Sequence, residues 1–236
     1  MCFRTALDGA LAEGWRWFET PVGPGSGARV TCGAPGARAG SRPDHAWGEA
    51  DWLGLRAVDG RISTKPYHRA GRVPTADWPP RPVCLPLAME PRLAARWAPG
   101  GVVTTEVYLR TGDATPWARV ARAAAHLARG DAPRPPFPVH TRPGGLGMSL
   151  RYVGAALQAV TVVAWHYALP PEPELESTWA AALPPAEAAA YRALLHLGER
   201  AGVDPWRRHL AVSWTSTPSG DWSPAACLVA PPPESP

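Results

Sequence analysis

Several segments of the chain alternate between apolar and polar residues, which is the pattern of a strand with one buried face. In residues 102–110, valine, threonine and leucine fall on one face, while Thr104, Glu106, Tyr108 and Arg110 fall on the other. The same pattern predicts three antiparallel hairpins, formed by residues 50–58 with 61–69, 147–153 with 158–169, and 209–215 with 222–229. Shorter extended segments are expected at residues 28–33 and 83–88.

Apolar residues three or four positions apart predict helices that separate the strand pairs. These helices are expected at residues 5–19, 90–97, 115–129 and 186–201. The proline- and glutamate-rich segment 170–184 is expected to be a connection that includes a helical turn. Segments 20–48 and 230–236 are expected to be flexible loops, because turn-forming and polar residues dominate them. The whole chain, 1–236, is expected to form a single domain with its own core.

The predicted strands share a two-faced pattern that limits how they can be assembled. One face is aliphatic, and the other carries arginine, lysine, tyrosine, serine, threonine or glutamate. If helices cover the aliphatic face, the polar face lies either in solvent, on an open sheet, or inside a closed barrel that encloses a ligand. Because tyrosine is less typical of a solvent face, the pattern favours the enclosed arrangement. We therefore expect an α+β fold, an antiparallel β-barrel or strongly curved sheet with its helices on the outside.

The stretch from Arg61 to Arg69 carries the most distinctive polar face. As a strand, it aligns Arg61, Ser63, Lys65, Tyr67 and Arg69 on one side, about 6–7 Å apart from one to the next. Three cations, a hydroxyl and a phenol make a poor core face and a suitable binding surface for an anion. Lys65 is also the only lysine in the chain.

Composition narrows the classes of protein that need to be considered. The net charge of +4 comes from scattered arginines, with no basic run of the kind that binds nucleic acid. The 12 tryptophans are a stronger signal, because an indole ring can stack on a flat or cationic ligand. Abundant alanine, arginine, glycine and proline, together with the lack of asparagine, indicate a GC-rich genome of the actinobacterial kind.

Cysteine spacing and apolar runs indicate a cytoplasmic location. The cysteines, at positions 2, 32, 84 and 227, form no C-x-x-C pair, which is typical of reduced thiols. No signal peptide is expected, because charged residues interrupt the first apolar segment. The longest apolar run, residues 157–169, is too short to cross a bilayer. The chain also lacks the common nucleophile, dinucleotide, phosphate-loop and zinc motifs, and no metal site is expected.

Lys65-Pro66-Tyr67 fits a K-x-Y motif, and helices and strand pairs follow one another in a repeated order. In these features the chain resembles the aromatic prenyltransferases of the ABBA fold, above all the indole (dimethylallyltryptophan synthase-like) and cyanobactin types. The resemblance implies a ten-stranded antiparallel barrel, built from repeated α-β-β units and ringed by helices, although the strand pattern itself identifies only seven or eight strands. It also implies that Arg, Lys and Tyr side chains bind an isoprenyl diphosphate inside the barrel.

The resemblance assigns roles to three groups of residues. The diphosphate would be bound by Arg61, Lys65, Tyr67, Tyr108, Arg151 and Tyr167. The rings that shield the allylic cation from water would be those of Trp165, Trp214 and Trp222. The carboxylate that takes a proton from the acceptor would be Glu106, Glu49 or Asp51. No cofactor is expected, although a diphosphate can bring Mg²⁺ with it.

These residues favour an enzyme of specialised natural-product metabolism. It would transfer an isoprenyl group from an allylic diphosphate to an aromatic acceptor, an indole or phenol in a small molecule or a peptide. Two alternatives stay open: a cyclase that needs no diphosphate, and a non-catalytic accessory protein that holds an aromatic ligand or peptide among its tryptophans. The sequence carries no signal for the acceptor, the prenyl chain length or the oligomeric state.

Overall fold

The fold is taken from a computed structural model of the chain. It describes residues 17–21, 29–35, 47–48, 50–58, 61–80, 88–98, 101–183, 185, 188–189, 191–192, 195–196, 209–216 and 219–229. The strands of this part are β1 (Trp17–Pro21), β2 (Arg29–Pro35), β3 (Trp52–Val58), β4 (Arg61–Arg69), β5 (Met89–Trp97), β6 (Thr104–Thr111), β7 (Leu146–Val153), β8 (Ala156–Trp165), β9 (His209–Ser216) and β10 (Trp222–Val229). Its longer helices are α2 (Trp117–Ala128) and α3 (Glu172–Ala182), and its short 3₁₀ turns are η2 (Ala70–Arg72), η3 (Thr75–Asp77) and η5 (His166–Ala168).

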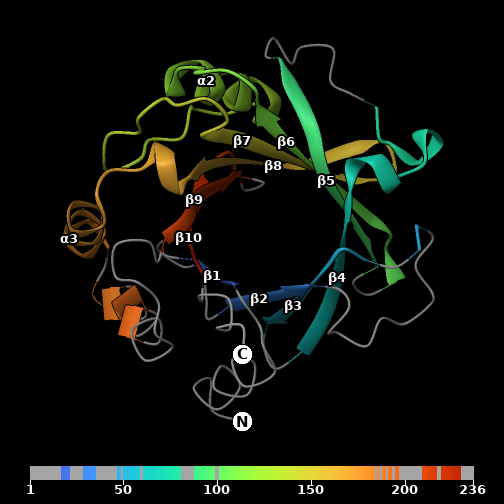
Figure 1. The fold of residues 1–236 in the computed structure, drawn as a ribbon, viewed down its shortest axis with the longest axis horizontal. Helices are drawn as coiled ribbons and strands as arrows, with labels where there is room; N and C mark the ends of the chain where they lie inside the picture. The colour runs from blue at the N-terminus through green and yellow to red at the C-terminus, as the bar shows by residue number, and fades with distance from the viewer. Residues whose placement is uncertain are drawn as a thin grey trace, which may run out of the picture.

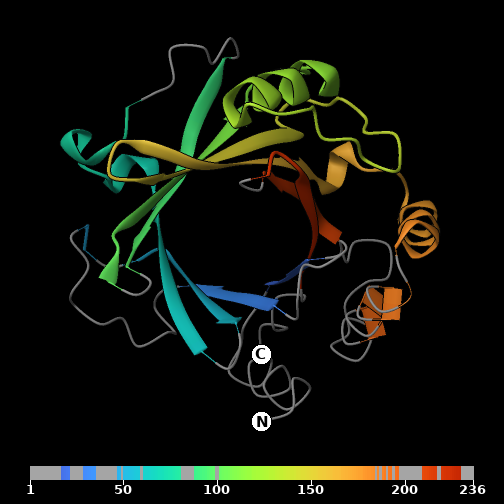
Figure 2. The ribbon, with the colours of Figure 1, turned by 180° about the vertical axis from the view of Figure 1, so that it is seen from behind.

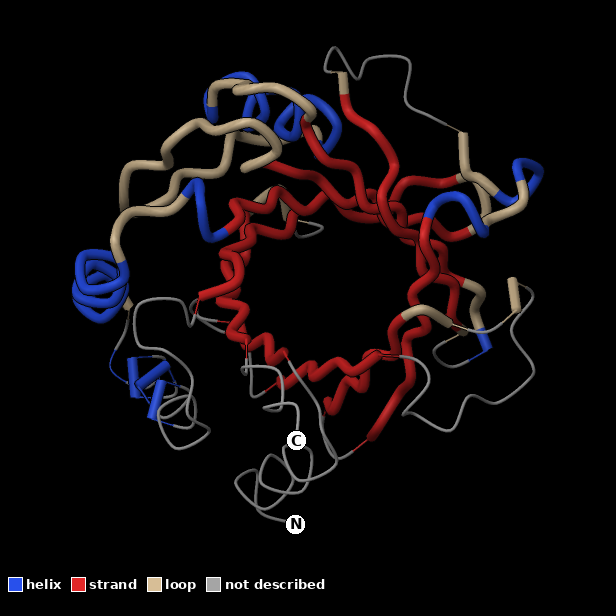
Figure 3. Tube along the Cα trace, viewed as in Figure 1, coloured by secondary structure: helices blue, strands red, loops and turns tan. Residues whose placement is uncertain are grey.

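The strands in the described part of the chain form a closed antiparallel barrel. Each strand pairs with the strands before and after it in the sequence, and β1 closes the ring by pairing with β10. The view down the barrel shows the strands as a ring, with α2 outside it at the top and α3 outside it at the left (Figure 1), and the opposite view shows both helices outside the ring as well (Figure 2). Coloured by secondary structure, the ring consists of strands alone (Figure 3).

The hairpins expected from the alternating pattern are present. They are β3–β4, β7–β8 and β9–β10, and the helix expected at 115–129 is α2. The expected strand at 28–33 is part of β2. The antiparallel α+β class is therefore confirmed, whereas helices follow only some strand pairs in the part of the chain that the structure describes, so a regular repeat of α-β-β units is not observed there.

Three local predictions are wrong. Residues 90–97 form β5 rather than a helix, because hydrogen bonding to β4 and β6 outweighs the helical preference of its alanine, leucine and arginine residues. Residues 17–19 belong to β1, and the remainder of the predicted helix 5–19 lies outside the described residues. The connection 170–184 contains α3, which has Pro173 in its first turn, where proline is compatible with a helix.

Three further predicted segments fall mainly or wholly on residues that are not described: residues 83–88, 186–201 and 230–236. A separate finding concerns helix length. Among the described residues, none of the helices is long and apolar enough to cross a membrane.

The main hydrophobic core lies on the outer face of the barrel, between β6–β9 and the segments around α2. Its buried members include Val120, Ala124, Leu150, Val162 and Val212. Helix α2 covers β7 and β8 with the apolar side of its sequence, and it ends at Arg129, which adopts the left-handed conformation with φ of 56°. Because successive strand residues point to opposite faces, this outer core directs the polar residues between them into the barrel.

Shortening a side chain in this core should destabilise the protein strongly. Leu150 is 2% exposed, and Leu150→Ala should lower the free energy of unfolding by about 2–5 kcal/mol, because it removes buried methyl groups and leaves a cavity. The control is Val153→Ala in the same strand, where the side chain is 37% exposed and the change should stay within about 0.5 kcal/mol. Urea unfolding monitored by far-ultraviolet circular dichroism measures both, and equal effects would contradict the placement of this core.

Candidate functional site

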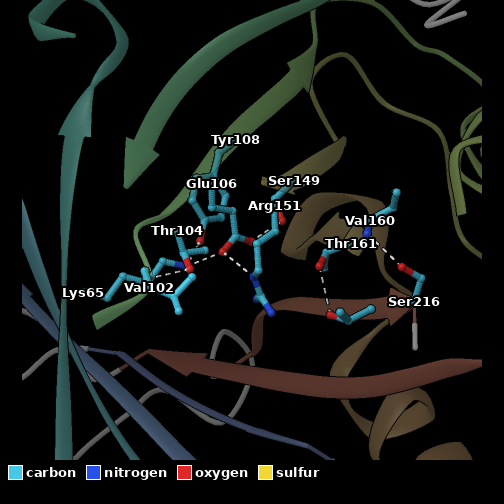
Figure 4. A network of polar contacts seen from close by, with 11 residues as sticks. Lys65, Val102, Thr104, Glu106, Tyr108, Ser149, Arg151, Val160, Thr161 and Ser216 are labelled. Carbon is cyan, nitrogen blue, oxygen red and sulfur yellow. Dashed lines mark hydrogen bonds and ion pairs between the residues drawn. The ribbon is translucent and has the colours of Figure 1, made fainter. Parts of the chain in front are cut away.

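Glu106 is a carboxylate buried on the inner face of the barrel, and cations lie on both sides of it. Glu106 as a whole is only 2% exposed to solvent. Oε2 accepts hydrogen bonds from Lys65 Nζ at 2.5 Å and from Arg151 Nε at 3.4 Å. Oε1 accepts a hydrogen bond from Ser149 Oγ at 2.5 Å, and Figure 4 shows Glu106 between these three side chains. Both oxygens of the carboxylate are therefore occupied by donors.

The strand register brings these residues together. Glu106 of β6 stands opposite Arg151 of β7 on one side and opposite Ala95 of β5 on the other. Ala95 in turn stands opposite Tyr67 of β4. Paired residues share a face of the sheet, so the short side chain of Ala95 lets the long Lys65 side chain reach across β5 to Glu106.

The charges around Glu106 keep it ionised. Burial by itself would raise the pKa of this carboxyl, but the charges of Lys65 and Arg151, with hydrogen bonds from Lys65 and Ser149, hold the pKa well below its usual range. Burial and the Glu106 charge raise the pKa of Tyr108, so its phenol stays protonated. The cluster therefore presents a fixed anion, two cations and neutral hydroxyl groups.

Aromatic rings surround the Lys65 ammonium. The nitrogen lies 4.3 Å from the centre of the Trp97 ring, 5.1 Å from that of Tyr67 and 5.2 Å from that of Tyr108. It also donates a hydrogen bond to the Tyr108 hydroxyl at 2.6 Å. The Arg151 guanidinium lies 5.9 Å from the Trp97 ring, so this one indole faces both cations.

A third cation, Arg110, lies further along β6. Arg110 is four residues from Glu106, roughly 13 Å along an extended strand. Its guanidinium lies 5.1 Å from the Trp165 ring, and its Nε donates to the carbonyl of Gly144 at 2.6 Å. Trp165 is close to Gly147, where a Cβ would come within 3.3 Å of the indole nitrogen. Arg110 and Trp165 thus share the inner face with the Glu106 cluster.

Five of the residues predicted from the sequence come together in this structure. They are Lys65, Tyr67, Glu106, Tyr108 and Arg151, which belong to three different strands and join one network of hydrogen bonds, ion pairs and ring contacts. Trp165 lies on the same face but beside Arg110. The roles proposed for these residues stay predictions.

The predicted shield residues Trp214 and Trp222 require a correction, because both belong to the outer face. Trp214 is buried in the outer core, with its ring 5.1 Å from that of Trp117. Trp222 packs against the same core, and its indole nitrogen donates to the carbonyl of Asp131 at 2.6 Å. The alternation of β9 and β10 turns these rings away from the inner face, so they cannot shield a cation there.

Asp51 also lies outside the cluster. Its carboxylate accepts a hydrogen bond from the backbone of Arg69 at 2.8 Å and pairs with the Arg69 and Arg72 side chains, both at 3.7 Å. These contacts hold the start of β3 against the end of β4, and none of them connects Asp51 to the cluster around Glu106.

For three predicted residues, the structure does not describe where the side chain lies. Glu49 lies outside the described residues, and the side chain of Arg61 in β4 is not described. Tyr167 was expected on a strand, but β8 ends at Trp165 and Tyr167 belongs to η5, so strand alternation does not apply to it.

Sequence reasoning missed the contributions of Trp97, Ser149 and Arg110. Trp97 was expected on a helix, and only the pairing of β5 with β6 places it on the same face as Ala95. Ser149 and Arg110 were both visible on the polar faces of predicted strands, but serine and arginine are too common there to be selected without the register. Within the described part of the chain, no three His, Cys, Asp or Glu residues are grouped as metal ligands would be.

No family model and no curated protein matches the chain in sequence. Solved structures do match it. The 5-dimethylallyltryptophan synthase from Streptomyces coelicolor, in complex with DMASPP and Trp, superimposes with a TM-score of 0.61 at 13% identity over 94% of this chain and 80% of that enzyme. Prenyltransferase PriB, in complex with L-tryptophan and dimethylallyl thiolodiphosphate, superimposes with a TM-score of 0.57 at 13% identity. The match covers 94% of this chain and 82% of that enzyme. NotF, in complex with brevianamide F and DMSPP, superimposes with a TM-score of 0.51 at 10% identity. The match covers 92% of this chain and 79% of that protein.

These likenesses establish the fold. The chain has the barrel architecture of the ABBA-fold aromatic prenyltransferases, as the K-x-Y motif and the order of elements led us to expect. With identities of 10–14%, the agreement concerns the path of the backbone and does not extend to individual residues.

The environment of Glu106 predicts how stability should depend on pH. The folded chain holds the Glu106 pKa below its ordinary value of 4.5, so the unfolded chain binds more protons in acid. The stabilisation by Glu106 is complete above that value and is lost progressively as the pH falls toward the folded-state pKa. Urea unfolding between pH 7 and pH 3 should therefore show a falling free energy of unfolding.

Glu106→Gln isolates this effect. It should lower the free energy of unfolding at pH 7 by about 3–5 kcal/mol, because two inward cations lose their counter-charge, and it should flatten the acid dependence. The control is Glu90→Gln, because the Glu90 side chain is 67% exposed and its pair with Arg92 is solvated. An acid dependence that is as steep in Glu106→Gln as in the wild type would show that other carboxylates cause it.

Proposed function

We propose that the chain is an aromatic prenyltransferase that transfers an isoprenyl group from an allylic diphosphate to an indole or phenol. The observation that carries this proposal is the buried Glu106, with Lys65 and Arg151 against it and aromatic rings beside it, on the inner face of a barrel. The fold of tryptophan and indole prenyltransferases supports it, because several of those enzymes were crystallised with a dimethylallyl diphosphate analogue and an aromatic acceptor.

The reaction requires stabilisation of a departing diphosphate. The allylic carbon–oxygen bond breaks, and the electron pair leaves with the diphosphate. Lys65 and Arg151 would stabilise that charge, and the hydroxyl group of Tyr67 would add a donor without adding charge. The predicted diphosphate contacts of Arg61 and Tyr167 belong to the same proposal. Any Mg²⁺ would arrive with the diphosphate rather than at a dedicated protein site.

Glu106 would act on the acceptor. An aromatic carbon would attack the allylic cation, positive charge would develop on the acceptor ring, and the ring would then lose its proton to the released diphosphate. A carboxylate held ionised can accept a hydrogen bond from the indole N–H or phenol O–H and stabilise that charge. Its lowered pKa makes Glu106 a weak base, so its contribution is electrostatic more than proton-abstracting.

The cation requires aromatic faces and the exclusion of water. Trp97 and Tyr67 supply rings beside the charged cluster, and Trp165 supplies one beside Arg110. Trp97 therefore takes the place that the sequence interpretation gave to Trp214 and Trp222. The setting of such an enzyme would be specialised metabolism.

One observation favours a second function, that of a non-catalytic protein that binds an aromatic ligand. Glu106 pairs with both Lys65 and Arg151, which leaves this cluster with a net charge of only about +1 by formal count. A multiply charged diphosphate would have to compete with that carboxylate. Calorimetry with dimethylallyl diphosphate and geranyl diphosphate distinguishes the two functions, because a binding protein of this kind would give no heat with either compound.

The direct test is an assay of the purified full-length chain. We expect a product whose mass is that of the acceptor plus one isoprenyl group when dimethylallyl or geranyl diphosphate is mixed with L-tryptophan, L-tyrosine or a tryptophan-containing peptide. Liquid chromatography with mass spectrometry detects it. If no acceptor is prenylated and neither diphosphate binds, the proposed function is wrong.

Lys65→Met should weaken diphosphate binding. Methionine keeps an unbranched side chain but removes the charge, and the loss of a charge-assisted hydrogen bond predicts a Kd for dimethylallyl thiolodiphosphate about 10- to 100-fold higher. The control is Arg122→Met, because Arg122 is exposed on α2 outside the barrel. Calorimetry gives both values. Unchanged binding in Lys65→Met would remove this residue from the diphosphate site.

A further inference from the structure

The Lys65 ammonium is enclosed in a way that exceeds what an ion pair requires. Three rings and one carboxylate face it: Tyr67, Trp97, Tyr108 and Glu106, which we call the cation cage. The ring centres lie 4.3–5.2 Å from Nζ, and the Lys65 side chain is only 14% exposed. The cage residues come from three neighbouring strands, so their positions are fixed by backbone pairing.

The chemistry of the cage suits an organic cation in general. Aromatic faces within about 6 Å attract positive charge, and the effect is larger where water is excluded. A carboxylate among the rings adds attraction for any cation, whether an ammonium or an allylic carbocation. A compact ammonium is strongly hydrated in water, whereas a delocalised cation gives up less hydration on entering such a site.

Lys65 occupies the cage through a long side chain, which can carry its ammonium out again. Its backbone lies in β4, opposite Gly54, but the ammonium stands at the end of four flexible methylene groups. Strong anions compete with Glu106 for the same nitrogen, because both offer charged oxygen acceptors. A diphosphate bound nearby would draw the ammonium toward itself and away from the rings.

We propose that Lys65 is an internal occupant of a binding site for an organic cation, and that a diphosphate draws it out so that the cationic centre of a ligand can take its place. The second part rests on the proposed function, since the ligand there is the allylic cation of the donor. The first part, a cation site filled by Lys65, stands without it.

The wild-type chain allows a direct test, because it contains one lysine. Protein made with lysine labelled with carbon-13 at Cε gives a single Cε–H signal in a two-dimensional NMR spectrum. Ring currents should displace this signal upfield of free lysine, and Trp97→Leu should reduce the displacement, whereas Trp222→Phe on the outer face should leave it unchanged. Saturation with dimethylallyl thiolodiphosphate should return it toward the free-lysine position.

A second experiment tests the site with a ligand. Lys65→Ala removes three methylene groups and the ammonium, which together correspond to n-propylammonium. We expect calorimetry to detect n-propylammonium binding to Lys65→Ala and none to the wild type, with 1-propanol as the neutral control. Adding Trp97→Leu to Lys65→Ala should weaken that binding by about 2- to 30-fold.

The outcomes separate the two parts of the proposal. An undisplaced Cε–H signal in the wild type, or a displacement that Trp97→Leu does not change, overturns the cation site. A displaced signal that stays in place when the diphosphate analogue is bound, as shown by calorimetry, overturns the movement of Lys65 alone. An analogue that does not bind contradicts the proposed function and the movement together, while the cation site is still decided by the wild-type signal. Equal binding of propanol and propylammonium to Lys65→Ala contradicts a site for cations.

Discussion

A carboxylate stays ionised inside a protein only if cations or strong donors lie against it, and this constraint organises the inner face of the barrel. Glu106 meets it with Lys65, Arg151 and Ser149, each from a strand that hydrogen bonding fixes in register. Removing Lys65 or Arg151 would leave Glu106 with a single counter-charge, whereas removing Glu106 would leave both cations without theirs. The arrangement that stabilises Glu106 also brings together the anion, cations and rings that group transfer would use.

The two faces of the same strands use aromatic residues in different ways. On the outside, Trp214 packs against Trp117 and stabilises the barrel wall by burial. On the inside, Trp97 and Trp165 each lie over a cation, so their ring faces act electrostatically as well as by contact. The high tryptophan content therefore reflects both the stability of the wall and the chemistry of its interior.

The alternating pattern was sufficient to predict the hairpins, α2 and the shared face of Lys65 and Tyr67, because alternation directly reflects one buried face. It could not identify β5, in which Ala94 and Ala95 are both buried and no alternation appears. Alternation in β9 places Trp214 on the face of Val212, opposite Ser213 and Thr215, so the shield role that the resemblance gave to Trp214 disagreed with the strand pattern itself. The contact between Glu106 and Lys65 joins residues 41 apart, which local pattern does not predict.

Closure of the ring through β1 and β10 joins strands from opposite parts of the sequence. A ribosome would therefore synthesise β2 to β9 before the last pairing partner of β1 became available. Contacts between residues so distant in sequence are slow to form, since long loops must be ordered first. Until then both edges of the unfinished sheet would offer unpaired backbone groups, so the open sheet is the stage at which this chain is most exposed to association with other chains.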